Sequence, residues 1–302
     1  RHLKYGTSHS SGVQSMYQNN NFIPVDLHCH STVSDGVLHP EEVAKRAHHN
    51  GVRLWSLTDH DETGGQAIAK KTAEELGMDY ITGIEISVTW QDRTLHMVGL
   101  NFDPANKTLN EGLAGIRANR DSRSYKIAEK FDALGIPGTF EGALRFADNP
   151  ELVSRSHFAR YLVDAGYCQT MQEVFDRYLN DQGPANVSMQ WASLPDAVEW
   201  IRDAGGVSVI AHPGRYKYTR SQFVDLWRTF KLLGGAGIEV VTSSHKPDQD
   251  YHYADVCRQY GFFASAGSDF HSPQESRLDL GHLPALPSGV RPIWHHLGYT
   301  NY

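Results

Sequence analysis

Seven short apolar runs, several of them separated by helical stretches, constrain the fold of this chain more than any other feature. They lie at residues 23–30, 53–60, 80–87, 94–100, 206–213, 236–241 and 262–271. Most are continuous rather than alternating in polarity, which is typical of strands buried on both faces. Strands that alternate with helices favour parallel pairing, so the sequence predicts an α/β fold, either a βα barrel or a doubly wound sheet.

The strand signal disappears between Asp103 and about residue 190. Residues 109–135 predict one long helix, because their apolar side chains recur at helical spacing. Residues 154–166 and 170–179 predict two shorter helices. We therefore expect a helical insertion domain between two parts of one barrel domain. The expected boundaries are 22–102 and 191–302 for the barrel domain and 103–190 for the insertion.

Composition limits the classes of function. A net charge of −7 argues against a general nucleic-acid-binding surface, although it allows a small basic pocket. No run of apolar residues is long enough for a transmembrane helix, and no secretory signal is visible. Three cysteines without regular spacing favour a reducing, cytoplasmic location. Residues 1–21 are polar and aperiodic, so we interpret them as a tag or disordered leader.

The first apolar run ends in three potential metal ligands, His28, Cys29 and His30. In an extended strand, residues i and i+2 share a face, while residue i+1 points the other way. We therefore expect His28 and His30 to project together into a site. Cys29 is expected to pack on the opposite side as a small buried side chain.

Ligand-type side chains also follow or interrupt the other runs. They are Asp35, His60, Glu85, His96, His212, Asp269 and His271. The carboxyl ends of barrel strands converge on one mouth, and an apolar barrel has no structural need for polar residues there. With the first two histidines, the set of nine suits two or three divalent ions. Nitrogen and oxygen ligands without thiolate favour Zn, Mn or Fe, and Glu85 is the natural bridging ligand. Such ions would attract a phosphate and lower the pKa of a bridging water.

In this order, HxH with a following Asp, then TDH, GxE, a strand His, AHP and SDxH resemble the PHP (polymerase and histidinol phosphatase) phosphoesterases. The resemblance extends from about Ile23 to at least His271, and all nine ligand positions have a match. It implies a distorted seven-stranded (β/α) barrel of the PHP type, here with a helical insertion. It also implies a trinuclear metal centre.

One subgroup of the family matches best. The segments "SDGVLHPEE", "LTDHD", "GIEIS", "HMVGLNFD", "SHFARYLV" and "AHPGRY" resemble nucleoside 3′,5′-bisphosphate phosphatases and the related 5′-to-3′ exoribonucleases. The motifs do not separate these two activities. The resemblance implies that a metal-held hydroxide attacks phosphorus in line. The expected substrate is a small phosphorylated nucleotide or the 5′ end of a short RNA, with no membrane and no obligate protein partner.

A nucleotide with a second phosphate requires a second anion pocket, for which arginine has suitable geometry. We expect Arg120, Arg123, Arg155 and Arg160 to bind substrate, together with Asp35 and His60. The expected catalytic residues are His157 and Arg215. For any single arginine, a solvated basic helix face is the alternative interpretation.

Three other functions remain as alternatives. A histidinol-phosphate-type phosphatase would share the barrel, but the arginine-bearing insertion disfavours it. An amidohydrolase-like C–N hydrolase commonly uses a bridging carboxylated lysine, and no lysine ends a strand run here. A non-catalytic PHP module would have lost ligands, and none of the nine is missing.

Overall fold

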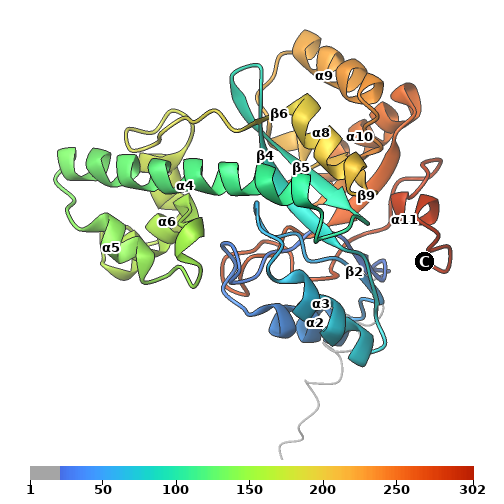
Figure 1. Ribbon diagram of the computed structural model, residues 1–302, viewed down its shortest axis with the longest axis horizontal. Helices are drawn as coiled ribbons and strands as arrows, with labels where there is room; N and C mark the ends of the chain where they lie inside the picture. Colours follow the sequence, from blue (N-terminus) through green and yellow to red (C-terminus); the bar gives the residue numbers. More distant parts are fainter. Residues whose placement is uncertain (1–20) are drawn as a thin grey trace, which may run out of the picture.

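The computed structural model (Figure 1) describes residues 21–302, so nearly all of the predicted leader lies outside the described residues. Its strands form two sheets. The first contains β1 (Val25–Asp26), β2 (Leu54–Trp55) and β3 (Asp79–Tyr80), all parallel. The second has the order β6-β4-β5-β7-β8-β9, with bounds Ala192–Ser193, Gly83–Trp90, Arg93–Leu100, Val207–Ile210, Gly237–Thr242 and Phe263–Gly267. The predicted α/β class is confirmed, whereas the described strands form two sheets and no continuous closed barrel.

Strand β5 corrects the prediction of parallel pairing. It is antiparallel to both β4 and β7, while β4·β6, β7·β8 and β8·β9 are parallel. Only Gln91 and Asp92 separate β4 from β5, and both have positive φ, 49° and 60°. Two residues of this conformation form a hairpin turn and are far too few for a parallel crossover.

The two sheets meet on both sides through the segments that follow β1 and β2. After β1, the Leu27 amide donates to the Ala266 carbonyl at 3.0 Å, joining this segment to β9. After β2, His60 forms an isolated parallel bridge with Glu85 of β4. The segments that follow the two short strands therefore lie between β9 and β4, which brings their polar residues close to those of the large sheet.

Helices cover the outer faces of both sheets. Near the first sheet lie α2 (Pro40–His49) and α3 (Gln66–Glu75), as Figure 1 shows. Near the second lie α8, α9 and α10, with bounds Leu194–Asp203, Arg220–Leu232 and Pro247–Tyr260, and short elements η3 (Pro213–Arg215) and α11 (Ile293–His296) complete this part. Within residues 21–302, no helix is both long enough and apolar enough to cross a membrane.

The region between β5 and β6 is helical, as predicted. The long helix is α4 (Lys107–Ala133), capped by the Asn106 side chain, which accepts from the Leu109 amide. Its first half packs into the main core, and its second half, with Ile127 and Phe131, into a separate apolar cluster. The shorter elements are α5 (Thr139–Leu144), η1 (Pro150–Leu152), α6 (Arg155–Asp164), α7 (Met171–Val174) and the π-helical η2 (Phe175–Leu179). The boundaries 103–190 for an insertion domain stay a prediction.

Candidate metal centre

The carboxylate of Glu85 lies at the centre of the cluster of predicted ligands. Its Oε1 is 3.1 Å from Nε2 of both His28 and His30, and 3.3 Å from Nδ1 of His60. Its Oε2 is 3.2 Å from His96 Nδ1 and 3.1 Å from His212 Nε2. Five imidazoles thus surround one fully buried carboxylate.

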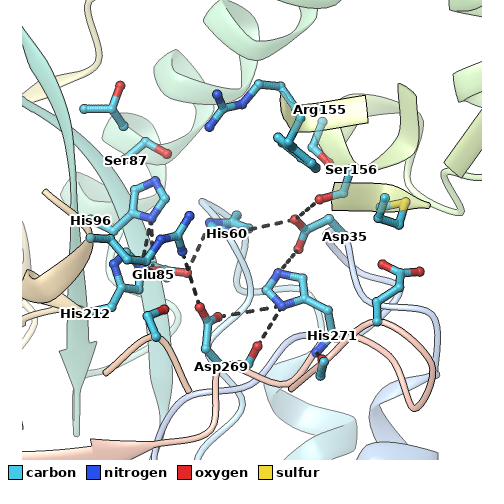
Figure 2. A pocket seen from close by; sticks show the side chains of 18 of the residues that line it. Asp35, His60, Glu85, Ser87, His96, Arg155, Ser156, His212, Asp269 and His271 are labelled. Atoms are coloured by element: carbon cyan, nitrogen blue, oxygen red, sulfur yellow. Dashed lines mark hydrogen bonds and ion pairs between the residues drawn. The ribbon is translucent and has the colours of Figure 1, made fainter. Parts of the chain in front are cut away.

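Two aspartates extend this cluster. Asp269 Oδ1 is 3.2 Å from His28 Nε2 and 3.0 Å from His30 Nε2. Asp35 Oδ1 is 3.2 Å from His271 Nε2, and its Oδ2 accepts from the Ser156 hydroxyl at 3.3 Å. Figure 2 shows the carboxylates of Asp35 and Asp269 on either side of the His271 ring. The structure brings all nine predicted residues together.

Strand alternation places the first two ligands as expected. His28 and His30 face the cluster, while Cys29 lies in a different apolar cluster with Trp55 and Leu57. The Cys29 thiol accepts from the Trp55 indole at 3.1 Å and donates to the Ser56 carbonyl at 3.3 Å. The free thiol is therefore held away from the site, as predicted.

Backbone strain is concentrated at the same place. His212 has φ 28°, Asp269 has φ 56°, and Asp61, next to His60, has φ 52°. Non-glycine residues rarely adopt such values, which cost free energy and are found preferentially at functional sites. Gly267 is required for a different reason, since a Cβ there would lie 2.2 Å from His28 Cβ.

Burial and mutual contact set the charge states of the cluster. Burial opposes the charged form of both rings, yet neighbouring carboxylates hold the pKa of His28 well above its usual range and raise that of His30 to about 10. Burial lowers the pKa of His212 to about 3. Against the effect of burial, nearby imidazoles hold the pKa of Glu85 and Asp269 well below the usual range. The carboxylates are therefore anionic at neutral pH and available as ligands.

Several buried nitrogen and oxygen atoms of the cluster make no contact with hydrogen-bond geometry to a described residue, even where a neighbouring atom is close. They are His28 Nε2, His30 Nδ1, Asp35 Oδ1, His60 Nδ1, Glu85 Oε1 and His212 Nδ1. Unsatisfied buried polar atoms are costly and call for an explanation. Three overlapping sets have ligand atoms within 4.8 Å of one another: His30/Asp35/His60/His271, His28/His30/Glu85/Asp269 and His60/Glu85/His96. Nitrogen and oxygen donors at this density fit divalent transition metals.

Sequence reasoning missed one carboxylate behind this cluster, Glu239 of β8. Its Oε2 accepts from His28 Nδ1 at 2.6 Å, and its Oε1 accepts from the His212 amide at 2.7 Å. Glu239 is buried. The one sequence signal that could have indicated it is a glutamate inside the apolar run "AGIEVV". This contact orients the His28 ring so that Nε2 faces the cluster.

Asp59 and Asp61, which flank His60, accept hydrogen bonds from loops around the cluster, and among the described residues neither carboxylate is hydrogen-bonded to the His60 ring. Asp59 accepts from the Ser31 amide at 2.7 Å and from two serine hydroxyls. Asp61 accepts from the amide and hydroxyl of Ser87 at 2.8 and 2.7 Å. Both carboxylates thereby fix segments that carry ligands.

Arg120, Arg160 and His157, all predicted to act on substrate, make hydrogen bonds to protein groups. Arg120 Nε donates to Asp61 Oδ2 at 2.8 Å, and its Nη2 donates to Ser87. Arg160 pairs with Glu275 and donates to the Asp35 carbonyl at 2.6 Å. His157 is buried, and its Nδ1 accepts from the Ser154 amide at 2.9 Å as part of a helix cap. Arg160 and His157 are not among the residues that line the cavity next to the cluster, and their action on substrate stays a prediction.

Arg123 and Arg155 face the cluster across a cavity of about 450 Å³, which we call the central cavity, whereas Arg215 lies beside the cluster. Arg123, Arg155 and Arg215 all line it, together with the metal-ligand candidates Asp35, His60, Glu85, His96, His212, Asp269 and His271. Figure 2 shows Arg155 and Ser156, from α6, on the opposite side of this cavity from Asp269. Arg215 Nη1 is 3.6 Å from Asp269 Oδ2. The cavity thus lies between the cluster and Arg123 and Arg155, which we call the basic wall.

The family model described as "PHP domain" matches residues 26–188. The chain belongs to the PHP domain family. This PHP chain is 48% identical over 273 residues to a 3′,5′-nucleoside bisphosphate phosphatase of Chromobacterium violaceum, covering 90% of this chain and 96% of that protein. It is 40% identical to a 5′-3′ exoribonuclease of Haemophilus influenzae, covering 89% and 97%.

Solved structures agree with this assignment. A Chromobacterium violaceum structure described as an amidohydrolase, with bound sulfate and no metal, has a TM-score of 0.89 and 47% identity over 91% of this PHP chain and 96% of that one. A Bifidobacterium adolescentis protein, proposed to be a metal-dependent phosphoesterase, has the same fold with a TM-score of 0.78 at 24% identity, covering 91% and 94%. The prediction of a PHP phosphoesterase from the bisphosphate phosphatase and exoribonuclease subgroup is therefore confirmed.

Proposed function

We propose that the chain is a metal-dependent phosphoesterase that removes the 3′-phosphate of a nucleoside 3′,5′-bisphosphate or cleaves short RNA from its 5′ end. The observation that carries this proposal is one cavity with two chemically different walls. One wall is formed by seven of the nine potential metal ligands, and the other carries Arg123 and Arg155. A substrate with two phosphoryl groups can contact both walls at once.

Two or three divalent ions, Mn, Fe or Zn, fit the nine residues His28, His30, Asp35, His60, Glu85, His96, His212, Asp269 and His271. When bound, such ions supply positive charge at the phosphoryl oxygens and lower the pKa of water. Glu85 can contribute to more than one ion, because its two oxygens face different histidines. Glu239 keeps His28 in position from behind.

The basic wall would hold the phosphoryl group that does not react. The side chain of Arg123 makes no hydrogen bond or ion pair to any described residue, and its Nε is buried without an acceptor. Burial and the nearby guanidinium of Arg120 hold its pKa well below the usual range, so a bound anion would relieve this repulsion. Arg215 lies beside Asp269, where it can contact the reacting phosphoryl group.

The C–N hydrolase alternative receives less support from this cavity. No lysine is among the described residues that line it, and Glu85 occupies its centre. Sulfate in the relative from Chromobacterium violaceum has the charge and shape of phosphate, although that structure is described as an amidohydrolase. A phosphate ester accounts for both walls, whereas an amide accounts for only one.

The two sheets can be interpreted as one distorted seven-stranded barrel. Counting the segments after β1 and β2 as strands, the order is β9, β1, β2, β4, β5, β7 and β8. These seven correspond to the seven apolar runs of the sequence. We also propose that residues 103–190 form an insertion domain whose α4 and α6 carry the basic wall, and that the enzyme acts in the cytoplasm, since its cysteines are all free.

A phosphate-release screen tests the proposed function. Metal-loaded protein is incubated separately with 3′-phosphoadenosine 5′-phosphate, short 5′-phosphorylated RNA and histidinol phosphate, and the same sample is analysed for metal. We expect turnover of at least one of the first two and little of the third, because only they can contact both walls. Preferred hydrolysis of histidinol phosphate would contradict the proposal, and so would full activity in protein shown to lack metal.

A further inference from the structure

A second cavity of about 340 Å³, which we call the side cavity, adjoins the central cavity. Arg123, Arg155, Trp191 and Thr94 line both, so these residues form the wall between them. None of the nine metal-ligand candidates lines the side cavity. It therefore lies beyond the basic wall as seen from the metal centre, and the proposed function leaves it without a role.

The side cavity holds cations without partners. The side chain of Arg93, which follows the hairpin turn between β4 and β5, makes no hydrogen bond or ion pair to any described residue, and of the two cavities Arg93 lines only this one. Arg123 is 8% exposed, is likewise unpaired among the described residues, and reaches both cavities. Its guanidinium packs 5.0 Å from the Trp191 ring centroid, which fixes it at the shared wall.

Neither carboxylate of the side cavity forms an ion pair with Arg93 or Arg123. Asp181 lies 3.8 Å from Arg155, and Asp92 is at the exposed hairpin tip. Uncharged amide groups, including those of Gln91 and Gln182, supply further hydrogen-bond donors. A volume of about 340 Å³ is in the range of small-molecule sites and exceeds the need of a single phosphoryl group.

We propose that the side cavity binds an anionic extension of the substrate, so that 3′-phosphorylated nucleoside 5′-diphosphates are substrates as well. The 3′-phosphate lies at the metal centre, the first 5′-phosphoryl group contacts Arg123 and Arg155, and the second enters the side cavity toward Arg93. Water still cleaves the 3′-phosphate ester, which releases inorganic phosphate and leaves a nucleoside 5′-diphosphate. This inference rests on the proposed function and specifies its substrate class.

The test compares 3′-phosphoadenosine 5′-phosphate with 3′-phosphoadenosine 5′-diphosphate on metal-loaded protein, and products are identified by anion-exchange chromatography. We expect AMP from the first nucleotide and ADP from the second, with a KM for the second about tenfold lower, as one charge-assisted contact provides. In Arg93→Ala this advantage should be lost. Arg228→Ala is the matched control, because Arg228 is exposed on α9, lines neither cavity and should keep the wild-type ratio of KM values.

Two outcomes overturn the inference alone. One is a KM for the 5′-diphosphate above that for the 5′-monophosphate in the wild type. The other is an equal effect of Arg93→Ala on both nucleotides, with the variant's melting temperature unchanged. Release of phosphate from neither nucleotide would overturn the bisphosphate-phosphatase activity on which this inference rests, and the inference with it, whereas cleavage of short RNA would still be tested by the screen above.

Discussion

At the scale of single residues, side chains outside the nine ligand candidates also hold the candidate metal centre in shape. Glu239 is far from most ligand candidates in sequence but contacts two of them, whereas Cys29 is next to two of them in sequence but packs elsewhere. Glu239 accepts from the His28 ring and from the His212 backbone amide, so it holds two of the ligand candidates in position. Cys29 is adjacent to two ligands in sequence yet packs against Trp55. Proximity in sequence is therefore a poor guide to participation in this site.

We expect Glu239→Gln to weaken metal binding by about 10- to 100-fold, as is typical for the loss of a carboxylate that orients a ligand histidine. Glutamine retains one acceptor oxygen but places an amide donor against either His28 or the His212 amide. Metal titration of the metal-free protein measures the effect. Glu199→Gln, at an exposed position of α8, is the control. Equal affinities in the two variants would assign Glu239 to packing alone.

Arg123→Ala should raise KM for a nucleoside bisphosphate by about 10- to 100-fold, because a bound phosphate would lose a charge-assisted contact. Hydrolysis of a simple aryl phosphate should change far less, since this substrate has no second phosphoryl group. Steady-state kinetics with both substrates provide the comparison, and Arg228→Ala is again the control. A similar loss with both substrates would show that Arg123 only supports the fold.

The nine ligand candidates could be predicted because each motif combines a ligand-type residue with the end or turn of an apolar run. The arginines could not be ranked in the same way. Helical spacing places Arg120 and Arg123 on one face, but only the fold shows that Arg120 is paired with Asp61 while Arg123 is unpaired. Glu239 was missed because an apolar run does not reveal which of its polar residues faces a ligand.

At the scale of elements, the sequence did not predict the direction of strand β5. This direction changes how the strand contributes to the site. A local pattern of apolar residues does not encode strand direction, so the seven runs were all expected to be parallel. The hairpin turn at Gln91 and Asp92 reverses β5 instead. His96 consequently reaches the cluster from within the strand, opposite Ser87 in the register, rather than from a strand end.

Helix α10 offers a test of stability against pH. Burial raises the pKa of Asp250, in the first turn of this helix, to about 7, with partial opposition from Arg277. In the unfolded chain an aspartate has a pKa of about 3.9. Between these values the folded protein binds more protons than the unfolded chain, so this residue makes stability decrease as pH rises from about 4 to about 7.

Asp250→Asn should remove this contribution. The free energy of unfolding of the variant minus that of the wild type should therefore be larger at pH 8 than at pH 5. Denaturant unfolding at both pH values gives the comparison, and effects of the unchanged metal-ligand candidates cancel in the difference. Asp225→Asn, at an exposed position of α9, is the control. A wild-type pH dependence in Asp250→Asn would contradict the assignment.

At the scale of the whole molecule, the metal-ligand candidates connect both sheets. His28 and His30 follow a strand of the small sheet, while Glu85 and His96 lie within strands of the large one. Ions bound to both groups would act as cross-links between the sheets. Ligands that bind only the folded protein stabilise it according to their concentration and affinity.

We therefore expect removal of metal by a chelator to lower the melting temperature by several degrees, and readdition of Mn²⁺ or Zn²⁺ to restore it. Differential scanning calorimetry on the same sample, with metal content measured before and after, tests this expectation. His282→Ala, outside the nine candidates, should respond like the wild type. An unchanged melting temperature despite complete loss of metal would mean that bound ions do not link the sheets.

The order of the ligands along the chain has a consequence for biosynthesis. His30 and Asp269 touch in the finished protein but are 239 residues apart in sequence. At ordinary translation rates the second emerges roughly 10–50 s after the first. Until then the two sets that contain Asp269 or His271 are incomplete, and only the set of His60, Glu85 and His96 can come together. On the proposed ligand assignment, a chain that ends before Asp269 would lack two of the three ligand sets.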